Sequence, residues 1–119
     1  VLGATFKPSS DDVRDAPSLA VAAALHGAGA EVRIYDPQGM DNARRAQPAL
    51  TYVPSLAAAV TDVSLLVVAT EWAEFRNADP VVLGELVAAR AVIDGRNCLD
   101  PVQWARAGWA YRGMGRPPA

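Results

Sequence analysis

The run SLLVVAT at residues 64–70 constrains the fold more than any other part of the sequence. Its apolar residues are consecutive and do not alternate with polar ones. This pattern indicates a short strand buried on both faces, as in the centre of a parallel sheet that is covered by helices. Similar short apolar runs, each bounded by turn residues, predict four further strands at residues 1–5, 31–35, 51–53 and 91–94.

Segments with helix signals lie between these strands. The clearest is 16–28, which is rich in Ala and Leu, has Asp15 and Pro17 at its start, and meets Gly27 and Gly29 at its end. These residues supply a capping side chain, a proline suited to the first helical turn, and glycines that end a helix. Shorter helices are expected at 41–46, 55–60 with Ser55 as N-cap, 81–89 after Pro80, and 101–107 after Asp100 and Pro101.

The alternation of strands and helices predicts an α/β fold, and 119 residues suit one domain. We expect a single Rossmann-like domain of three layers, with a doubly wound, mainly parallel sheet of five or six strands between helices. The tail at 109–119 is expected to be a loop with one short strand. Ligands of such folds bind beyond the carboxyl ends of the strands, so function is expected in the loops at 6–17, 36–39, 71–75 and 95–97.

Charge and cysteine content exclude several classes of function. The formal net charge is −2, and no basic run marks a surface for nucleic acid or membrane lipid. The single cysteine, Cys98, and the single histidine, His26, cannot form a disulfide or a zinc cluster, so no metal site is expected. Residues 1–5 carry no signal peptide or long apolar stretch, which favours a cytoplasmic protein. Because they read as a strand without an initiator Met, we also expect the chain to be part of a longer polypeptide.

A dinucleotide site would need the glycine pattern G-x-G-x-x-G between the first strand and the first helix, and only Gly3 lies near that turn. Asp36 ends the second strand, where a dinucleotide fold places its ribose-binding acid. Without the glycine turn, we interpret Asp36 as a turn-initiating residue before Pro37.

Three cations are candidates for an anion site at the carboxyl edge of the sheet. Lys7, the only lysine, follows the first strand, Arg14 precedes the first helix, and Arg96 follows the strand at 91–94. Lysine acts on phosphate as a point charge, whereas arginine can bind two oxygens of one group with its planar fork. The alternative is that Lys7 and Arg14 pair with neighbouring aspartates to hold the loop, and that Arg96 is a surface residue.

Cys98 is flanked by Asn97 and Asp100, which suggests a nucleophile. A reactive thiolate needs a base or a positive environment, and His26 lies on the distant first helix. We therefore interpret Cys98 as a small apolar residue of the core. Trp72 is interpreted as a packing residue, although its place in a strand-end loop leaves open a contact with ligand.

Taken in order, the loops resemble the C-terminal, UDP-binding domain of the UDP-glucose/GDP-mannose dehydrogenase family. The matching segments cover nearly the whole chain: GATFKPSSDDVRDAPSL, GAEVRIYDP, VVATEWAEF, VIDGRNCLD and YRGMGRP. The resemblance implies an NAD-dependent oxidation of a nucleotide sugar at C6, most like the members that convert UDP-glucose to UDP-glucuronate by two hydride transfers for polysaccharide biosynthesis.

In that family an N-terminal domain binds NAD, and a central helical domain supplies the catalytic cysteine and the dimer contacts. The resemblance therefore implies that residues 1–119 are the UDP-sugar-binding domain of a longer, homodimeric enzyme. It also implies that this domain holds no catalytic residue and is inactive and monomeric when isolated. Matched by position, Phe6 and Lys7 are similar to the pair that contacts the substrate, Arg96 to the arginine that binds the UDP-sugar, and Arg14 to the arginine that reaches the NAD. The alternative from a different class is a stand-alone nucleotide-binding or regulatory module without redox chemistry.

Overall fold

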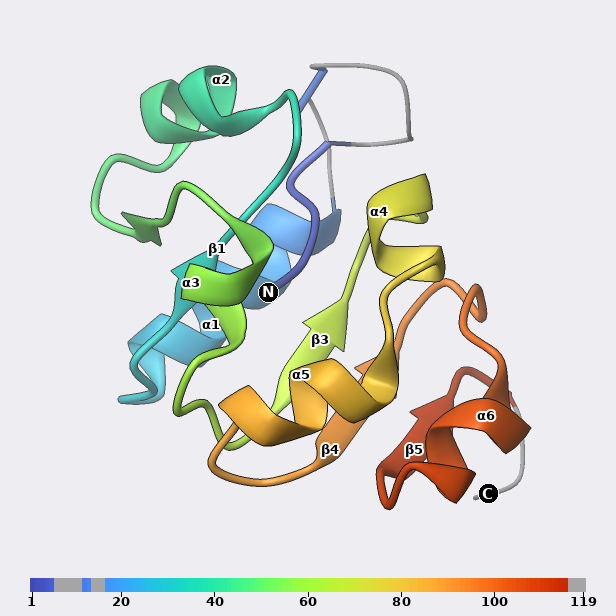
Figure 1. Ribbon diagram of the computed structural model, residues 1–119. Coiled ribbons are helices and arrows are strands. Elements are labelled where there is room, and N and C mark those ends of the chain that lie inside the picture. Colours follow the sequence, from blue (N-terminus) through green and yellow to red (C-terminus); the bar gives the residue numbers. More distant parts are fainter. Residues whose placement is uncertain (6–11, 14–16, 116–119) are drawn as a thin grey trace.

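Two parallel sheets form the centre of the computed structural model, which describes residues 1–5, 12–13 and 17–115 (Figure 1). One sheet pairs β1 with β2, and the other has the order β3-β4-β5. The elements along the chain are α1 (Pro17–Gly27), β1 (Arg33–Ile34), α2 (Met40–Ala46), β2 (Thr51–Tyr52), α3 (Leu56–Val60), β3 (Leu66–Val68), α4 (Ala73–Arg76), α5 (Pro80–Leu86), β4 (Ala91–Asp94), α6 (Pro101–Arg106) and β5 (Ala110–Gly113).

The segment 1–5 joins the two sheets. Leu2 forms parallel bridges with Tyr35 on one side and with Val68 on the other. The Leu2 N–H donates to the Val67 carbonyl at 2.8 Å, and the Gly3 N–H donates to the Tyr35 carbonyl at 2.7 Å. The order across both sheets is therefore β2, β1, segment 1–5, β3, β4 and β5, which confirms the predicted parallel α/β fold.

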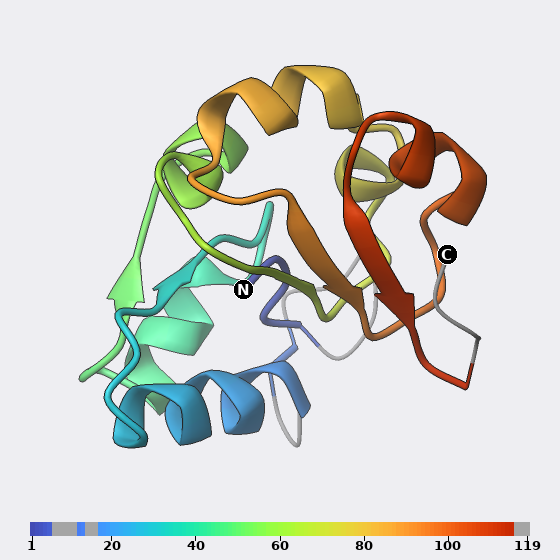
Figure 2. The same ribbon diagram turned by 90° about the horizontal axis from the view of Figure 1, so that it is seen from below.

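Helices lie on both sides of the strands, as Figures 1 and 2 show together. Leu19 and Ala22 of α1 pack with Ile34 of β1 in one apolar cluster. On the other face, Leu83 of α5 and Trp104 of α6 belong to a second cluster with the strands β3, β4 and β5.

The predicted helix caps are confirmed where the structure describes them. The Ser55 side chain accepts from the Ala58 N–H at 3.1 Å. The Asp100 side chain accepts from the N–H of Val102 at 3.0 Å and from that of Gln103 at 3.3 Å. Both caps satisfy amide groups that have no partner inside the helix.

Two helix predictions were wrong in detail. The segment 71–75 was expected to be a loop, but α4 begins within it, and this single turn buries Phe75 to 1% exposure. The helix expected at 81–89 ends at Leu86, because the Ala88 N–H leaves the helix and donates to the Val63 carbonyl at 2.9 Å.

In the tail, β5 is the one short strand that the sequence predicts.

The expectation that both faces of residues 64–70 are buried was also wrong. Leu66 and Val68 are 2% and 1% exposed, but Leu65 is 41% exposed and Val67 is only partly buried. The same alternation continues in β4 and β5. α5 and α6 cover one side of these strands, whereas no helix in the described part of the chain covers the other side (Figure 2).

Candidate functional site

The carboxyl ends of the strands, where ligand was expected, are organised by two buried aspartates. Asp36 follows β1 and is 1% exposed, and Asp94 ends β4 and is 0% exposed. Both accept hydrogen bonds from the loops around them, so the local geometry of this edge depends on these two carboxylates.

Both oxygens of Asp36 are used. Oδ2 accepts from the Ala4 N–H at 2.8 Å, the Thr5 N–H at 3.1 Å and the Trp72 Nε1 at 3.0 Å. Oδ1 accepts from the N–H groups of Gln38 and Gly39, at 2.9 and 2.7 Å. Asp36 therefore initiates the turn after β1, as predicted, and also links the loops that follow three neighbouring strands.

These contacts decide the protonation of Asp36. Burial alone would raise the pKa of the carboxyl, but hydrogen bonds from backbone N–H groups, those of Ala4, Gln38, Gly39 and Thr5, outweigh it and hold the pKa below its ordinary value. Asp36 is thus an ionised carboxylate. Both of its oxygens already accept hydrogen bonds from the surrounding loops, so the carboxylate is not available to bind a ribose. Trp72 is likewise a packing residue, since it is 7% exposed and its N–H is directed at Asp36.

Asp94 plays the corresponding part beside β4. Its Oδ2 accepts from the Leu99 N–H and from the Tyr111 hydroxyl, both at 2.8 Å. It also lies 3.7 Å from the Cys98 sulfur. Burial and then the negative charge of Asp94 raise the pKa of the Cys98 thiol to about 12, which agrees with the interpretation of Cys98 as an unreactive residue.

The close approach of segment 1–5 to Thr70, beyond the end of β3, depends on Gly3. Its φ of +107° lies in the left-handed region, and a Cβ there would lie 2.5 Å from the Thr70 Oγ1. The Thr70 hydroxyl donates to the Thr5 carbonyl at 2.7 Å and so ties the end of segment 1–5 to the end of β3. No local pattern in the sequence reveals this arrangement, because the hydrogen bond between Thr70 and Thr5 joins residues 65 positions apart.

Arg96 lies across the ends of β3 and β4. Its Nε donates to the Ala69 carbonyl at 3.0 Å, and its Nη1 lies 3.6 Å from the Glu71 carboxylate. Its side chain is 28% exposed, so the guanidinium is held in place yet reachable from solvent. The sequence predicted Arg96 at this carboxyl edge. The alternative was that Arg96 is a surface residue, but its side chain is partly buried.

The other predicted site residues, Phe6, Lys7 and Arg14, lie outside the described residues. Their convergence with Arg96 therefore stays a prediction. The residues that the sequence reasoning missed are Asp94, which ends β4, and Glu71, which lies three residues beyond the end of β3. That position was the available signal, since strand ends of a parallel sheet meet at one edge.

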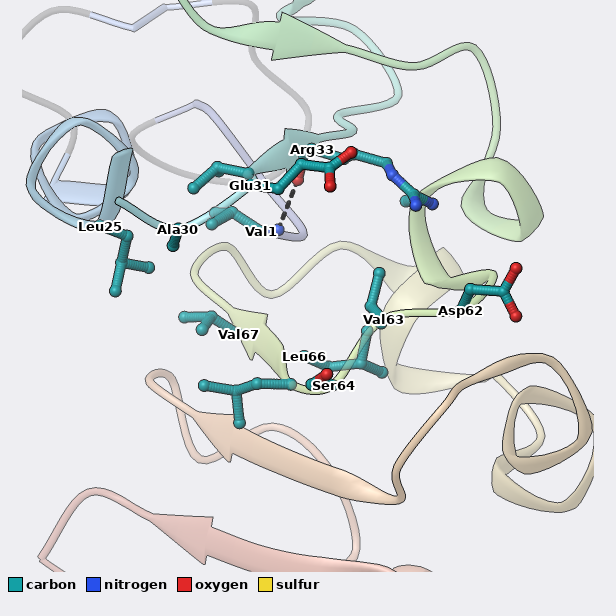
Figure 3. Close-up of a pocket in the computed structure, with 13 residues that line it drawn as sticks. Val1, Leu25, Ala30, Glu31, Arg33, Asp62, Val63, Ser64, Leu66 and Val67 are labelled. Carbon is teal, nitrogen blue, oxygen red and sulfur yellow. Dashed lines mark hydrogen bonds between the residues drawn. The ribbon is translucent and has the colours of Figure 1, made fainter. Parts of the chain in front are cut away.

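A cavity of about 340 Å³ lies at the opposite edge, among the starts of the strands (Figure 3). Its lining includes Val1, Arg33, Asp62 and Leu66. The Arg33 guanidinium is occupied there by the carbonyls of Ala58 and Thr61, at 3.0 and 2.7 Å. The cavity is thus remote from Arg96 and is not the site predicted from the sequence.

Within the described ranges, no group of three or more His, Cys, Asp and Glu side chains could hold a metal ion. Nor does a helix in that part of the chain have the length and apolar character needed to cross a membrane.

Comparison with known proteins gives consistent matches. The family described as "UDP-glucose/GDP-mannose dehydrogenase family, UDP binding domain" matches residues 1–101. A UDP-glucose 6-dehydrogenase of Rhizobium meliloti (strain 1021) is 42% identical over 117 residues, which are 98% of this chain and 27% of the relative. A UDP-glucose 6-dehydrogenase of Pseudomonas aeruginosa is 37% identical over 123 residues, with the same two shares covered.

Solved structures match over nearly the whole chain as well. An NDP-N-acetyl-D-galactosaminuronic acid dehydrogenase from Methanosarcina mazei Go1 aligns with a TM-score of 0.85 and 27% identity, covering 97% of this chain and 24% of that protein. A UDP-glucose dehydrogenase from Pyrobaculum islandicum aligns with a TM-score of 0.77 and 32% identity, covering 98% and 24%. The chain therefore spans about a quarter of the length of the proteins that it matches.

Proposed function

Because this chain belongs to the UDP-glucose/GDP-mannose dehydrogenase family, as its UDP-binding domain, we propose that it holds the UDP-sugar in a longer, NAD-dependent enzyme. The proposed reaction oxidises the C6 alcohol of UDP-glucose to the carboxylate of UDP-glucuronate by two successive hydride transfers. The choice of UDP-glucose rests on the names of the two relatives given above.

The placement of Arg96 carries this proposal. Its Nε is anchored on the Ala69 carbonyl, which directs the guanidinium along the edge where strands of this fold present ligands. A diphosphate carries about two negative charges, and a planar guanidinium can donate to two of its oxygens at once. Glu71, 3.6 Å away, limits the directions that the guanidinium can take. We assign Phe6 and Lys7 to the same substrate and Arg14 to the NAD of the adjoining domain.

The described residues do not fit an NAD site of their own. Asp36 stands where a ribose-binding acid would be, but it is 1% exposed and its two oxygens already accept from the loops. NAD would accept the hydride when bound, and we assign that binding mainly to the N-terminal domain of the longer protein. The Cys98 thiol, with a pKa of about 12, is not the catalytic nucleophile. This domain thus binds and orients the substrate, and the reacting groups lie elsewhere.

The test is the steady-state rate of NADH formation by the full-length protein. A charge-assisted hydrogen bond contributes about 1.5 to 3 kcal/mol, so Arg96→Ala and Lys7→Ala should each raise the KM for UDP-glucose about tenfold or more. Arg106→Ala is the matched control, because this arginine is exposed on α6 and should leave the KM unchanged. Wild-type KM values in both test variants, or loss of turnover in Cys98→Ser, would contradict the proposal.

We extend the proposal to the whole protein as a cytoplasmic homodimer that joins through its central domain and serves polysaccharide biosynthesis. Light scattering on the full-length protein should give twice the chain mass. The isolated chain of 119 residues should give the mass of one chain and should form no NADH from UDP-glucose. NADH formation by the isolated chain would contradict the assignment of the reacting groups to other domains.

A further inference from the structure

The turn at 95–97, which carries Arg96, follows β4, and β4 lies between β3 and β5 (Figure 1). The Arg96 side chain reaches over the end of β3, where its Nε donates to the Ala69 carbonyl at 3.0 Å. The Asn97 side chain reaches the opposite way, to Met114 directly beyond the end of β5. These two neighbouring side chains therefore connect the end of β4 to the strands on either side of it.

Asn97 is joined to the backbone of Met114 by a reciprocal pair of hydrogen bonds. Its Nδ2 donates to the Met114 carbonyl, and its Oδ1 accepts from the Met114 N–H, both at 2.8 Å. We call this pair the Asn97 clasp. An amide side chain suits such a pair because it supplies a donor and an acceptor together. The clasp therefore fixes both the position and the direction of the Asn97 side chain.

The backbone at Asn97 is also specialised. Its φ of +52° lies in the left-handed region, which asparagine tolerates better than most residues with a side chain. On either side of it, Asp94 accepts from the Arg96 N–H at 3.3 Å and from the Leu99 N–H at 2.8 Å. The bond at the Arg96 end is the longer of these two and is longer than both bonds of the clasp. The clasp is thus a close restraint on the turn next to Arg96.

A restraint on this turn bears directly on anion binding by Arg96. A long arginine side chain has many rotamers, and a diphosphate binds those in which the planar fork faces it. The apparent affinity falls by the fraction of time that the guanidinium spends in other positions. A turn that holds the guanidinium near the Ala69 carbonyl and Glu71 therefore increases affinity without any contact of its own with the ligand.

We propose that Asn97 is a positioning residue for the substrate: the Asn97 clasp holds the turn at 95–97 so that the Arg96 guanidinium stays across the end of β3, where it binds the diphosphate of the nucleotide sugar. This inference rests on the proposed function, in which Arg96 binds the UDP-sugar. Asn97 acts through Arg96. The alternative is that the hydrogen bonds to Asp94 hold the turn by themselves, so that the clasp serves stability alone.

The first test is the steady-state kinetics of Asn97→Gly in the full-length enzyme. Glycine adopts a positive φ at little cost, so the turn can form without the clasp. We expect the KM for UDP-glucose to rise about three- to tenfold, because the guanidinium spends less time in the binding position. The kcat and the KM for NAD should stay within about twofold of wild type.

Thr61→Ala is the matched control for these kinetics. It also removes an exposed side-chain hydrogen bond, from Thr61 to the Ala57 carbonyl at 2.7 Å, but beside the Arg33 guanidinium at the opposite edge of the sheet. All three kinetic constants should therefore be unchanged. A fall in kcat or a rise in the KM for NAD in Asn97→Gly, as large as the change in the KM for UDP-glucose, would show a general loss of structure and overturn the proposal.

A double-mutant cycle tests whether Asn97 acts through Arg96. In the Arg96→Ala background the guanidinium is absent, so adding Asn97→Gly should change the KM for UDP-glucose by less than about twofold. If the two effects multiply, Asn97 affects the substrate independently of Arg96, and the positioning role is refuted.

The reaction of Arg96 with phenylglyoxal gives a readout that needs no substrate. The reagent modifies guanidinium groups, and mass spectrometry of the full-length protein gives the rate at each arginine. Arg96 should react about threefold faster or more in Asn97→Gly than in the wild type, because the guanidinium leaves the Ala69 carbonyl more often. Arg106, which is exposed on α6, should react at one rate in both proteins. An unchanged rate at Arg96 would contradict the proposal.

The same measurements separate the two proposals. If Arg96 reacts faster in Asn97→Gly but neither Asn97→Gly nor Arg96→Ala changes the KM for UDP-glucose, the clasp restrains Arg96 and the proposed function fails. If Arg96→Ala raises this KM and Asn97→Gly matches the wild type in both measurements, the positioning role alone fails.

Discussion

Replacing Asp36 by asparagine tests whether the carboxylate holds the strand-end loops together. Asparagine keeps one acceptor oxygen and replaces the other by an NH2 group, which cannot accept from the loops. In the less damaging orientation the NH2 group faces the N–H groups of Gln38 and Gly39, which now donate to Oδ1 at 2.9 and 2.7 Å. The opposite orientation would leave the N–H groups of Ala4 and Thr5 and the Trp72 indole without their acceptor.

The expected loss of stability follows from these contacts. A buried donor left without an acceptor costs about 1 to 3 kcal/mol, which applies to the Gly39 N–H. The Gln38 N–H belongs to an exposed residue and adds less, so the two together cost about 3 kcal/mol. This is a large share of the roughly 5 to 15 kcal/mol by which a domain is stable. With a urea m-value of about 1.5 kcal/mol/M, the unfolding midpoint should fall by about 2 M.

The assay is urea unfolding of the 119-residue chain followed by circular dichroism. The control is Asp41→Asn, since Asp41 is 86% exposed and forms an exposed ion pair with Arg44, so the change should stay below about 1 kcal/mol. A change of less than about 1 kcal/mol in Asp36→Asn, with an unchanged m-value, would refute the reasoning.

The pH dependence gives an independent check of the same carboxylate. The pKa of Asp36 is lowered in the folded state, so its contribution to stability is present above the unfolded value of about 4 and is lost as the pH falls through the folded value. The difference in stability between the wild type and Asp36→Asn should therefore be constant near neutral pH. It should shrink below about pH 4, and a difference that grows under acid would contradict the assignment.

Three further predictions concern the same edge of the sheet. Gly39→Ala should destabilise the chain by about 1 to 3 kcal/mol in urea unfolding, because the added Cβ would overlap the Thr5 side chain; wild-type stability would show that the turn can shift. Tyr111→Phe should cost about 1 to 2 kcal/mol by the same measurement, because it removes the hydroxyl that donates to Asp94 at 2.8 Å, and no loss would mean that water replaces it. Cys98, with a pKa of about 12, should react with iodoacetamide at pH 8 about a thousandfold more slowly than an ordinary cysteine, whose pKa is about 8.5; a rate near that of free cysteine would contradict the buried, protonated thiol.

Local signals in the sequence predicted local structure well. The caps at Ser55 and Asp100 involve residues two or three positions apart, so the sequence around them contained the whole interaction. The order of strands and helices followed in the same way from short apolar runs and their breakers. The end of α5 was missed because it depends on a hydrogen bond from Ala88 to Val63, which no local pattern reveals.

The sequence predicted where the candidate site lies in the fold, but not the hydrogen bonds that hold its residues. Arg96 was placed at the carboxyl edge because it follows a buried strand, and the structure places it there. The hydrogen bond from Arg96 to the Ala69 carbonyl depends on the tertiary fold. So does the hydrogen bond from Trp72 to Asp36, which joins residues 36 positions apart. The open face of β3 was missed for a different reason, since consecutive apolar residues show which sides of a strand avoid water but not which element covers them.

The contacts of Asp36 have a consequence for how this domain can diversify. Four of its partners are main-chain N–H groups, those of Ala4, Thr5, Gln38 and Gly39. A main-chain donor is present whichever side chain the residue carries, proline excepted. Position 38 can therefore be substituted widely without loss of its bond to Asp36, whereas Gly39 must stay small. An engineer could thus vary side chains in the loop after β1 while the hydrogen bonds that hold the loop remain intact.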